Sequence, residues 1–104
     1  MSKAEYVNQQ VSSNKVVVFS KSYCPFCKKA KEALKSVGLE DYLVIELDQR
    51  DDGDAIQDAL QKITGARSVP RVFIGGKFVG GADDILKLAA EGKLKPLLQA
   101  AGAL

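Results

Sequence analysis

The 104-residue sequence contains no histidine, and this absence excludes several kinds of active site. A Ser-His-Asp triad, a Cys-His dyad and a histidine-based metal centre all require an imidazole ring. Any proton transfer must therefore use thiols, carboxylates, lysines, tyrosines or water.

Cysteine is also scarce, since the chain has only Cys24 and Cys27. Two cysteines would make a poor disulfide framework for a secreted protein of this size, so we expect a reducing, cytoplasmic setting in which any disulfide is transient. Zinc usually takes four Cys or His ligands, which one chain cannot supply here, and no metal is expected. The first residues resemble neither a secretion signal nor a transit peptide, and no window is apolar enough to span a membrane.

Neither sign of charge dominates, because 15 Lys and Arg residues face 13 Asp and Glu residues. The net charge of +2 is too small to indicate a nucleic acid or a membrane as the main partner. The length and the 46% hydrophobic content fit one domain with a modest core. We therefore expect residues 1–104 to form a single domain and a monomer.

The stretch from residue 16 to residue 35 joins a strand pattern to a helix pattern. Residues 16–19 form a continuous β-branched and aromatic run, which is typical of a central strand covered on both faces. After a short turn, the motif Cys24-Pro25-Phe26-Cys27 opens a helix, because Pro25 suits the first helical turn, where its missing N–H costs nothing. Cys24 then falls at the N-cap position.

This position should make Cys24 the reactive thiol of the pair. Free backbone N–H groups and the positive end of the helix dipole favour a thiolate there, so we expect the pKa of Cys24 to fall from about 8.5 into the range of about 3.5–7.5. Lys21 adds a cation nearby, whereas Cys27 should remain a thiol. Two such cysteines can serve merely as small apolar residues, but C-x-x-C at a strand-to-helix junction is typical of a thioredoxin-like redox motif.

The rest of the chain alternates between helix and strand patterns. Apolar spacing predicts helices over about 3–12, 25–37, 51–64, from 83 up to Gly92, and a short one around Pro96, with strands over 16–19, 43–47, 71–74 and 77–79. The crossover helix makes the first two strands parallel, and Gly75-Gly76 predicts a tight antiparallel hairpin. The predicted fold class is α/β, a thioredoxin-like mixed four-stranded sheet of order 2-1-3-4 with helices on both faces.

Three further features accompany the C-x-x-C motif, namely Lys21 and the segments Thr64-Gly65-Ala66-Arg67-Ser68-Val69-Pro70 and Gly80-Gly81-Ala82-Asp83. With these features, the sequence closely resembles the dithiol glutaredoxins. The resemblance covers almost the whole chain. It implies a glutathione-dependent disulfide oxidoreductase in which Cys24 attacks and Cys27 resolves, acting on glutathionylated or disulfide-containing proteins. Phe26 stands where the family more often has tyrosine, so any role of a hydroxyl next to Cys24 is lost.

The same resemblance implies a glutathione site beside Cys24. Val69-Pro70 should form a cis-proline turn that offers the Val69 backbone to substrate, and Lys21 should bind the glycine-end carboxylate with Gln57 and Arg67 close by. The helix start after Gly80 suits the γ-glutamyl end, where we favour Asp83 with the Ala82 backbone and keep Asp84 as the rival for the amine. The predicted glutathione-binding residues are Lys21, Pro25, Phe26, Gln57, Arg67, Val69, Pro70, Gly81, Ala82, Asp83 and Asp84.

Plainer interpretations stay open at this stage. Asp83 and Asp84 can be ordinary helix caps, Gly80-Gly81 can be a simple loop, and the lysines of residues 28–35 can be a solvated helix face. Three other functions also fit the motif. These are a thioredoxin-type reductase that does not use glutathione, a dimer that bridges a 2Fe–2S cluster with glutathione ligands, and a non-catalytic interaction domain. Pro25 makes the cluster-bridging dimer less favourable, because it stiffens the loop.

Overall fold

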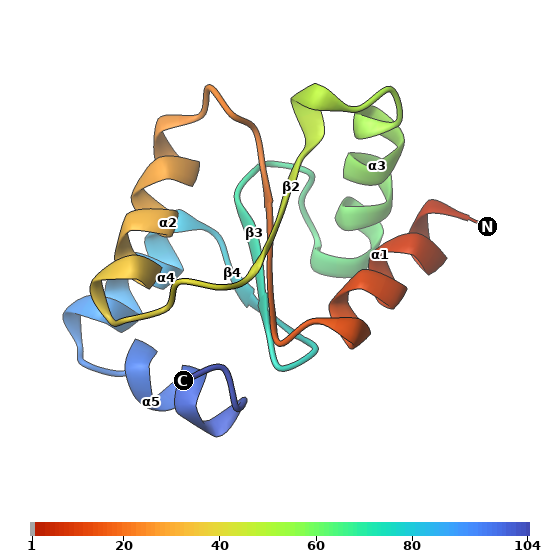
Figure 1. Cartoon of the computed structure of the whole chain (residues 1–104). Coiled ribbons are helices and arrows are strands. Elements are labelled where there is room, and N and C mark those ends of the chain that lie inside the picture. Colours follow the sequence, from red (N-terminus) through yellow and green to blue (C-terminus); the bar gives the residue numbers. More distant parts are fainter. Residues whose placement is uncertain (1) are drawn as a thin grey trace.

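The computed structural model describes residues 2–104, and within that range helices cover both faces of a four-stranded sheet (Figure 1). The helices are α1 (Lys3–Ser13), α2 (Pro25–Ser36), α3 (Gly53–Thr64), α4 (Ala82–Ala90) and α5 (Leu94–Ala100), with one 3-10 turn, η1 (Leu47–Gln49). The strands are β1 (Val16–Ser20), β2 (Leu43–Glu46), β3 (Arg71–Ile74) and β4 (Lys77–Gly80). No helix in the described range is long and apolar enough to cross a membrane.

The sheet has the predicted order, β2-β1-β3-β4. β1 pairs in parallel with β2, because α2 carries the chain back to the same end of the sheet, and β1 pairs antiparallel with β3. β3 and β4 are joined by Gly75 and Gly76, whose φ angles of 62° and 82° allow the two-residue turn. The thioredoxin-like arrangement expected from the order of elements is therefore confirmed.

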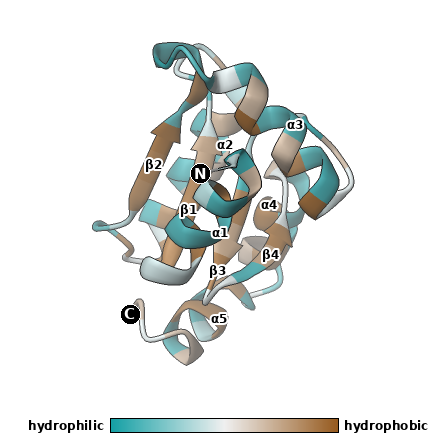
Figure 2. Cartoon of the chain, turned by 90° about the vertical axis from the view of Figure 1, so that its right-hand side faces the viewer, coloured by the Kyte–Doolittle hydropathy of each residue, from teal (hydrophilic) through white to brown (hydrophobic). Residues whose placement is uncertain are grey.

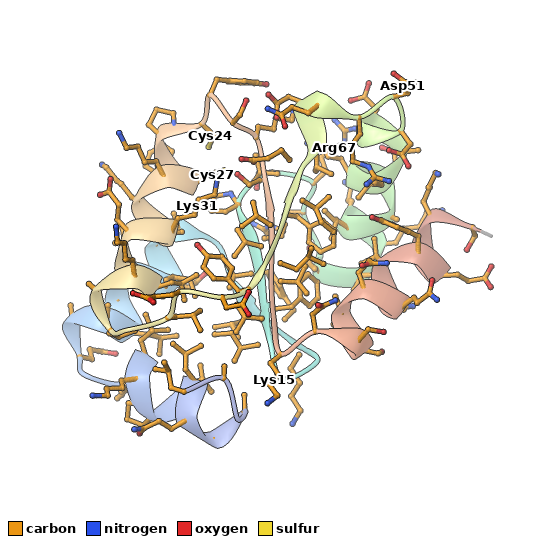
Figure 3. The ribbon with its side chains drawn as sticks, in the orientation of Figure 1. Lys15, Cys24, Cys27, Lys31, Asp51 and Arg67 are labelled. Carbon is orange, nitrogen blue, oxygen red and sulfur yellow. The ribbon has the colours of Figure 1, made fainter. Side chains whose placement is uncertain are left out.

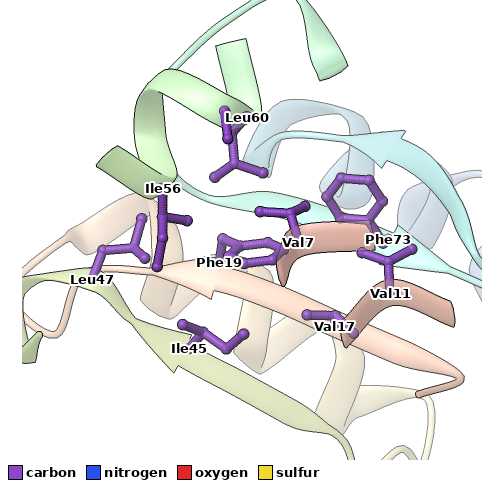
Figure 4. Packing of buried hydrophobic residues seen from close by; sticks show 10 residues of the cluster. Val7, Val11, Val17, Phe19, Ile45, Leu47, Ile56, Leu60 and Phe73 are labelled. Carbon is purple, nitrogen blue, oxygen red and sulfur yellow. The ribbon is translucent and has the colours of Figure 1, made fainter. Parts of the chain in front are cut away.

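The sheet separates two apolar layers. Every residue of β1 is buried, and alternate side chains of this strand point to opposite faces. Val17 and Phe19 pack with residues of α1 and α3, as Figure 4 shows, whereas Val16 and Val18 pack with residues of α2, α4 and α5. Figure 2 shows the strands as mostly hydrophobic and the helices as mixed, which is the pattern expected when each helix buries one face.

Two predicted boundaries were wrong near the end of β2. Leu47 was expected to end the strand but begins η1, and α3 starts at Gly53 instead of Asp51. Leu47 stays buried, and Gly53 packs directly against its carbonyl group with no room for a Cβ atom. Gly53 therefore allows the start of α3 to lie directly against the first residue of η1.

Candidate active site

Cys24 occupies the N-cap of α2, as predicted. Its Sγ accepts a hydrogen bond from the backbone N–H of Cys27 at 3.2 Å, and Pro25 fills the first helical turn. The backbone N–H of Cys24 donates to the carbonyl of Lys21 at 3.0 Å, which closes a turn just before the helix. The half-buried sulfur thus meets a backbone donor and the positive end of a helix, both of which stabilise negative charge.

Cys27 lies one helical turn further along and is fully buried. Burial raises the pKa of the Cys27 thiol to about 11, and its hydrogen bond with Cys24 acts in the same direction. Cys27 therefore remains a thiol at neutral pH. The two sulfurs, which Figure 3 shows near one end of α2, have different chemical environments although they are close in sequence.

The loop before β3 lies opposite the C-x-x-C motif. The Val69-Pro70 peptide bond is cis, as the resemblance implied. The carbonyl oxygen of Val69 lies 3.9 Å from the Sγ of Cys24, so this loop is within reach of anything bound to the sulfur. Val69 is half-buried and lines a groove beside the motif.

A groove of about 330 Å³ runs from the C-x-x-C motif to the start of α4. Its lining residues are Phe26, Ser68, Val69, Pro70, Arg71, Gly81, Ala82, Asp83 and Asp84. A larger hollow of about 480 Å³ lies at the opposite end of the sheet beside Lys15, and no residue of the C-x-x-C motif or of the proline turn lines it (Figure 3). The groove therefore brings together most of the predicted γ-glutamyl end of the site, the proline turn and Phe26.

The two aspartates at the start of α4 have different environments. Asp84 Oδ2 accepts a hydrogen bond from the backbone N–H of Gly81 at 3.0 Å, so this carboxylate caps the helix. Gly80 allows this contact, since a Cβ atom there would clash with the Asp84 side chain. Asp83 is exposed on the groove. The capping interpretation therefore applies to Asp84, and Asp83 is the better placed of the two for a ligand amine.

Gln57 and Arg67 lie outside the groove lining. Gln57 is only 5% exposed, and its Nε2 donates to the carbonyl of Arg67 at 2.8 Å. The Arg67 guanidinium is 3.2 Å from the Asp58 carboxylate on α3, and its position beside that helix is visible in Figure 3. The structure thus places Gln57 beneath the segment that leads to Val69, where it supports the backbone.

Lys21 and Pro25 are the predicted binding residues nearest to Cys24 in the sequence, apart from Phe26. Lys21 is half-buried at the start of the turn that ends at Cys24, and Pro25 is exposed next to the sulfur. Both lie close to the reactive sulfur in the chain, but neither lines the groove that leads to α4. Lys21 is therefore tied to Cys24 by the turn, whereas the groove leads from Phe26 and Val69 towards α4.

Ser68 and Arg71 line the groove but were missed by the sequence analysis. Arg71 Nε donates to the Ser68 carbonyl at 2.8 Å, and a second guanidinium nitrogen lies 3.2 Å from the Ser68 hydroxyl. The same guanidinium stacks 5.1 Å from the centre of the Phe78 ring. The sequence did offer a signal for Arg71, since a cationic residue follows Pro70 directly. Arg71 was instead interpreted only as part of the predicted strand over residues 71–74.

Comparison with known proteins agrees with this geometry. The Glutaredoxin family model matches residues 16–79. The chain is 50% identical over 99 residues to Glutaredoxin-C4 of Arabidopsis thaliana, covering 95% of this chain and 73% of that protein. It superposes on oxidized glutaredoxin 2 of Chlamydomonas reinhardtii with a TM-score of 0.94 and 57% identity over all of both chains. The buckwheat glutaredoxin–glutathione complex gives a TM-score of 0.93 and 48% identity, covering 98% of this chain and 92% of that one.

Proposed function

This chain belongs to the glutaredoxin family of glutathione-dependent thiol oxidoreductases, and from that membership we propose that it reduces protein–glutathione mixed disulfides and protein disulfides. The observation that carries the proposal is the setting of Cys24. Its sulfur accepts a hydrogen bond from the Cys27 backbone and lies 3.9 Å from the Val69 carbonyl. Val69 and Phe26 both line the groove that ends at α4.

We assign the groove to glutathione, which a buckwheat relative binds in its solved complex. Glutathione has two carboxylates and one amine. Its site therefore needs two groups that bind carboxylates and one acidic group that binds the amine. The free N–H groups at the start of α4 suit the γ-glutamyl carboxylate, and Asp83 suits the amine. The Val69 backbone can pair with the peptide, and Lys21 can bind the glycine-end carboxylate.

The reaction begins with the thiolate of Cys24. It attacks the glutathione sulfur of a mixed disulfide, the old S–S bond breaks, and the protein substrate leaves as a thiolate that takes up a proton. Cys24 is now joined to glutathione. The thiolate of a second glutathione attacks the sulfur of the bound one, which yields glutathione disulfide and restores the Cys24 thiolate.

Protein disulfides need the second cysteine. Attack by Cys24 leaves it joined to the substrate, and Cys27 then attacks the Cys24 sulfur, which releases the second substrate thiol and forms a Cys24–Cys27 disulfide. The proton of Cys27 passes to the departing thiolate. Two glutathione molecules then reduce the Cys24–Cys27 disulfide and are themselves joined as glutathione disulfide.

Serine variants test this division of roles. Cys24→Ser should abolish the reduction of a glutathionylated peptide, because the hydroxyl is not a nucleophile at neutral pH, whereas Cys27→Ser should retain it. Cys27→Ser should lose only the reduction of protein disulfides. The measurement is the rate of glutathione disulfide formation with each substrate. Equal loss of mixed-disulfide reduction in both variants would contradict the proposal.

A further inference from the structure

Asp48 makes two contacts to the turn that precedes Cys24. Its Oδ1 accepts a hydrogen bond from the backbone N–H of Ser22 at 2.9 Å, and its Oδ2 accepts one from the Ser22 hydroxyl. The two residues are 26 positions apart, so this is a tertiary contact between η1 and the active-site turn. Both carboxylate oxygens of Asp48 therefore bind Ser22.

Ser22 lies in the middle of a closed turn. The backbone N–H of Cys24 donates to the carbonyl of Lys21, so Lys21 begins the turn and Cys24 ends it. The hydrogen bonds from Ser22 lower the pKa of the Asp48 carboxyl, and the charge of Lys21 contributes in the same direction. Asp48 thus faces both the serine it binds and the lysine at the start of the turn.

The carboxylate is itself held by a well-packed element. The preceding residue, Leu47, is 2% exposed and belongs to the core cluster between the sheet and α3, as Figure 4 shows. Gly53 at the start of α3 packs against the Leu47 carbonyl. Because η1 is fixed on both sides, Asp48 can transmit that rigidity to an exposed turn.

We propose that Asp48 is a positioning residue, which binds Ser22 and so fixes the separation between the Lys21 ammonium and the Cys24 sulfur that one glutathione molecule spans. The proposal rests on the function proposed above, because Lys21 matters only if glutathione is the ligand. Asp48 acts through the turn and takes no part in the exchange of disulfides.

Kinetics of Asp48→Asn test the proposal, with Asp51→Asn as the matched control. Asp51 is an exposed carboxylate in the same acidic stretch, at the same end of the molecule as Cys24 (Figure 3), so its replacement removes the same charge. Hydrogen bonds to charged groups are strong enough that we expect the KM for a glutathionylated peptide to rise about tenfold in Asp48→Asn. We expect kcat to change less than about twofold, because the sulfur keeps its backbone donor from Cys27, and Asp51→Asn to match the wild type.

Variants of Ser22 separate positioning from a general loss of structure. Ser22→Ala removes the hydroxyl contact and should raise KM in the same direction, and combining it with Asp48→Asn should add little. Ser22→Thr retains both donors and should restore a KM near that of the wild type. A wild-type KM in both Asp48→Asn and Ser22→Ala would overturn the proposal.

Hydrogen exchange of the Ser22 amide gives a readout that needs no substrate. Asp48→Asn should speed this exchange about tenfold, whereas Asp51→Asn should not change it. If the wild-type chain fails to reduce mixed disulfides, the proposed function fails, and the exchange experiment still decides whether Asp48 holds the turn. Unchanged exchange in Asp48→Asn would overturn the positioning role even in an active enzyme.

Discussion

Cys27 holds its proton far more tightly than an exposed thiol does. Burial raises its pKa to about 11, above the value of about 8.5 for a free cysteine, and the hydrogen bond with Cys24 adds to the effect. An unfolded chain exposes the same thiol to water. The folded state therefore binds the Cys27 proton more strongly than the unfolded state, and stability depends on pH through this residue.

We predict that the free energy of unfolding declines at alkaline pH because of Cys27. Its contribution is fully present below the unfolded pKa of about 8.5 and is lost as the pH rises through about 11. Urea denaturation of the wild type and Cys27→Ala across this window measures the effect. Lysines and tyrosines titrate in the same range, so only the difference between the two profiles reports on Cys27. Parallel profiles would contradict the prediction.

The residues that could be identified from the sequence have roles that follow from a local pattern or from the resemblance to glutaredoxins. Pro25 marks a helix start, so the position of Cys24 at the N-cap could be predicted without coordinates. Asp48 and Arg71 could not be identified in this way. Asp48 acts on a turn 26 residues away, and Arg71 becomes part of the site only because the groove passes over it. Distant partners leave no periodic signal in a sequence.

At the scale of elements, the junction between η1 and α3 combines tight packing with proximity to the site. Gly53 is the first residue of α3 and lies against the carbonyl of Leu47. Leu47 directly precedes Asp48 in the chain. The aspartates before α3 predicted a helix start close to Asp51, but the helix begins at Gly53, the residue without a side chain. Acidic residues mark the region of a helix start, and here the helix begins at the residue that packs against Leu47.

Gly53→Ala should therefore destabilise the protein, although alanine is the better helix former. On propensity alone this change would favour the folded state, since glycine in a helix costs roughly 0.5–1 kcal/mol relative to alanine. The added Cβ would instead clash with the Leu47 carbonyl, and overpacking of this kind costs about 1–3 kcal/mol. Chemical denaturation measures the net change. Equal or higher stability would show that η1 can move away without loss.

At the scale of the whole molecule, β1 joins the two apolar layers into one structure. Its five residues are all buried, and the first four, Val16 to Phe19, alternate between the two clusters. The directions of two strand pairs could be predicted because a helical crossover and a two-residue glycine turn each permit one direction. The order 2-1-3-4 came from the thioredoxin-like plan that the succession of elements indicated. The sequence predicted helices on both faces of the sheet, but it did not predict which helices share a face. That depends on the face over which each connection crosses the sheet.

The shared strand leads to a last prediction, that both layers unfold together although their contacts are separate. Ile56 lies in the layer with α1 and α3, Ile85 lies in the layer with α2, α4 and α5, and both are fully buried. Shortening either residue to valine should lower the free energy of unfolding by about 0.5–1.5 kcal/mol. Because the sheet lies between them, the loss in the double variant should equal the sum of the two single losses within about 0.5 kcal/mol.

Urea denaturation followed by far-ultraviolet circular dichroism and by tyrosine fluorescence should give one coincident transition for the wild type and for each variant. Two separated transitions would show that β1 does not couple the layers, and a double variant far from the sum would show that the two isoleucines interact through the sheet.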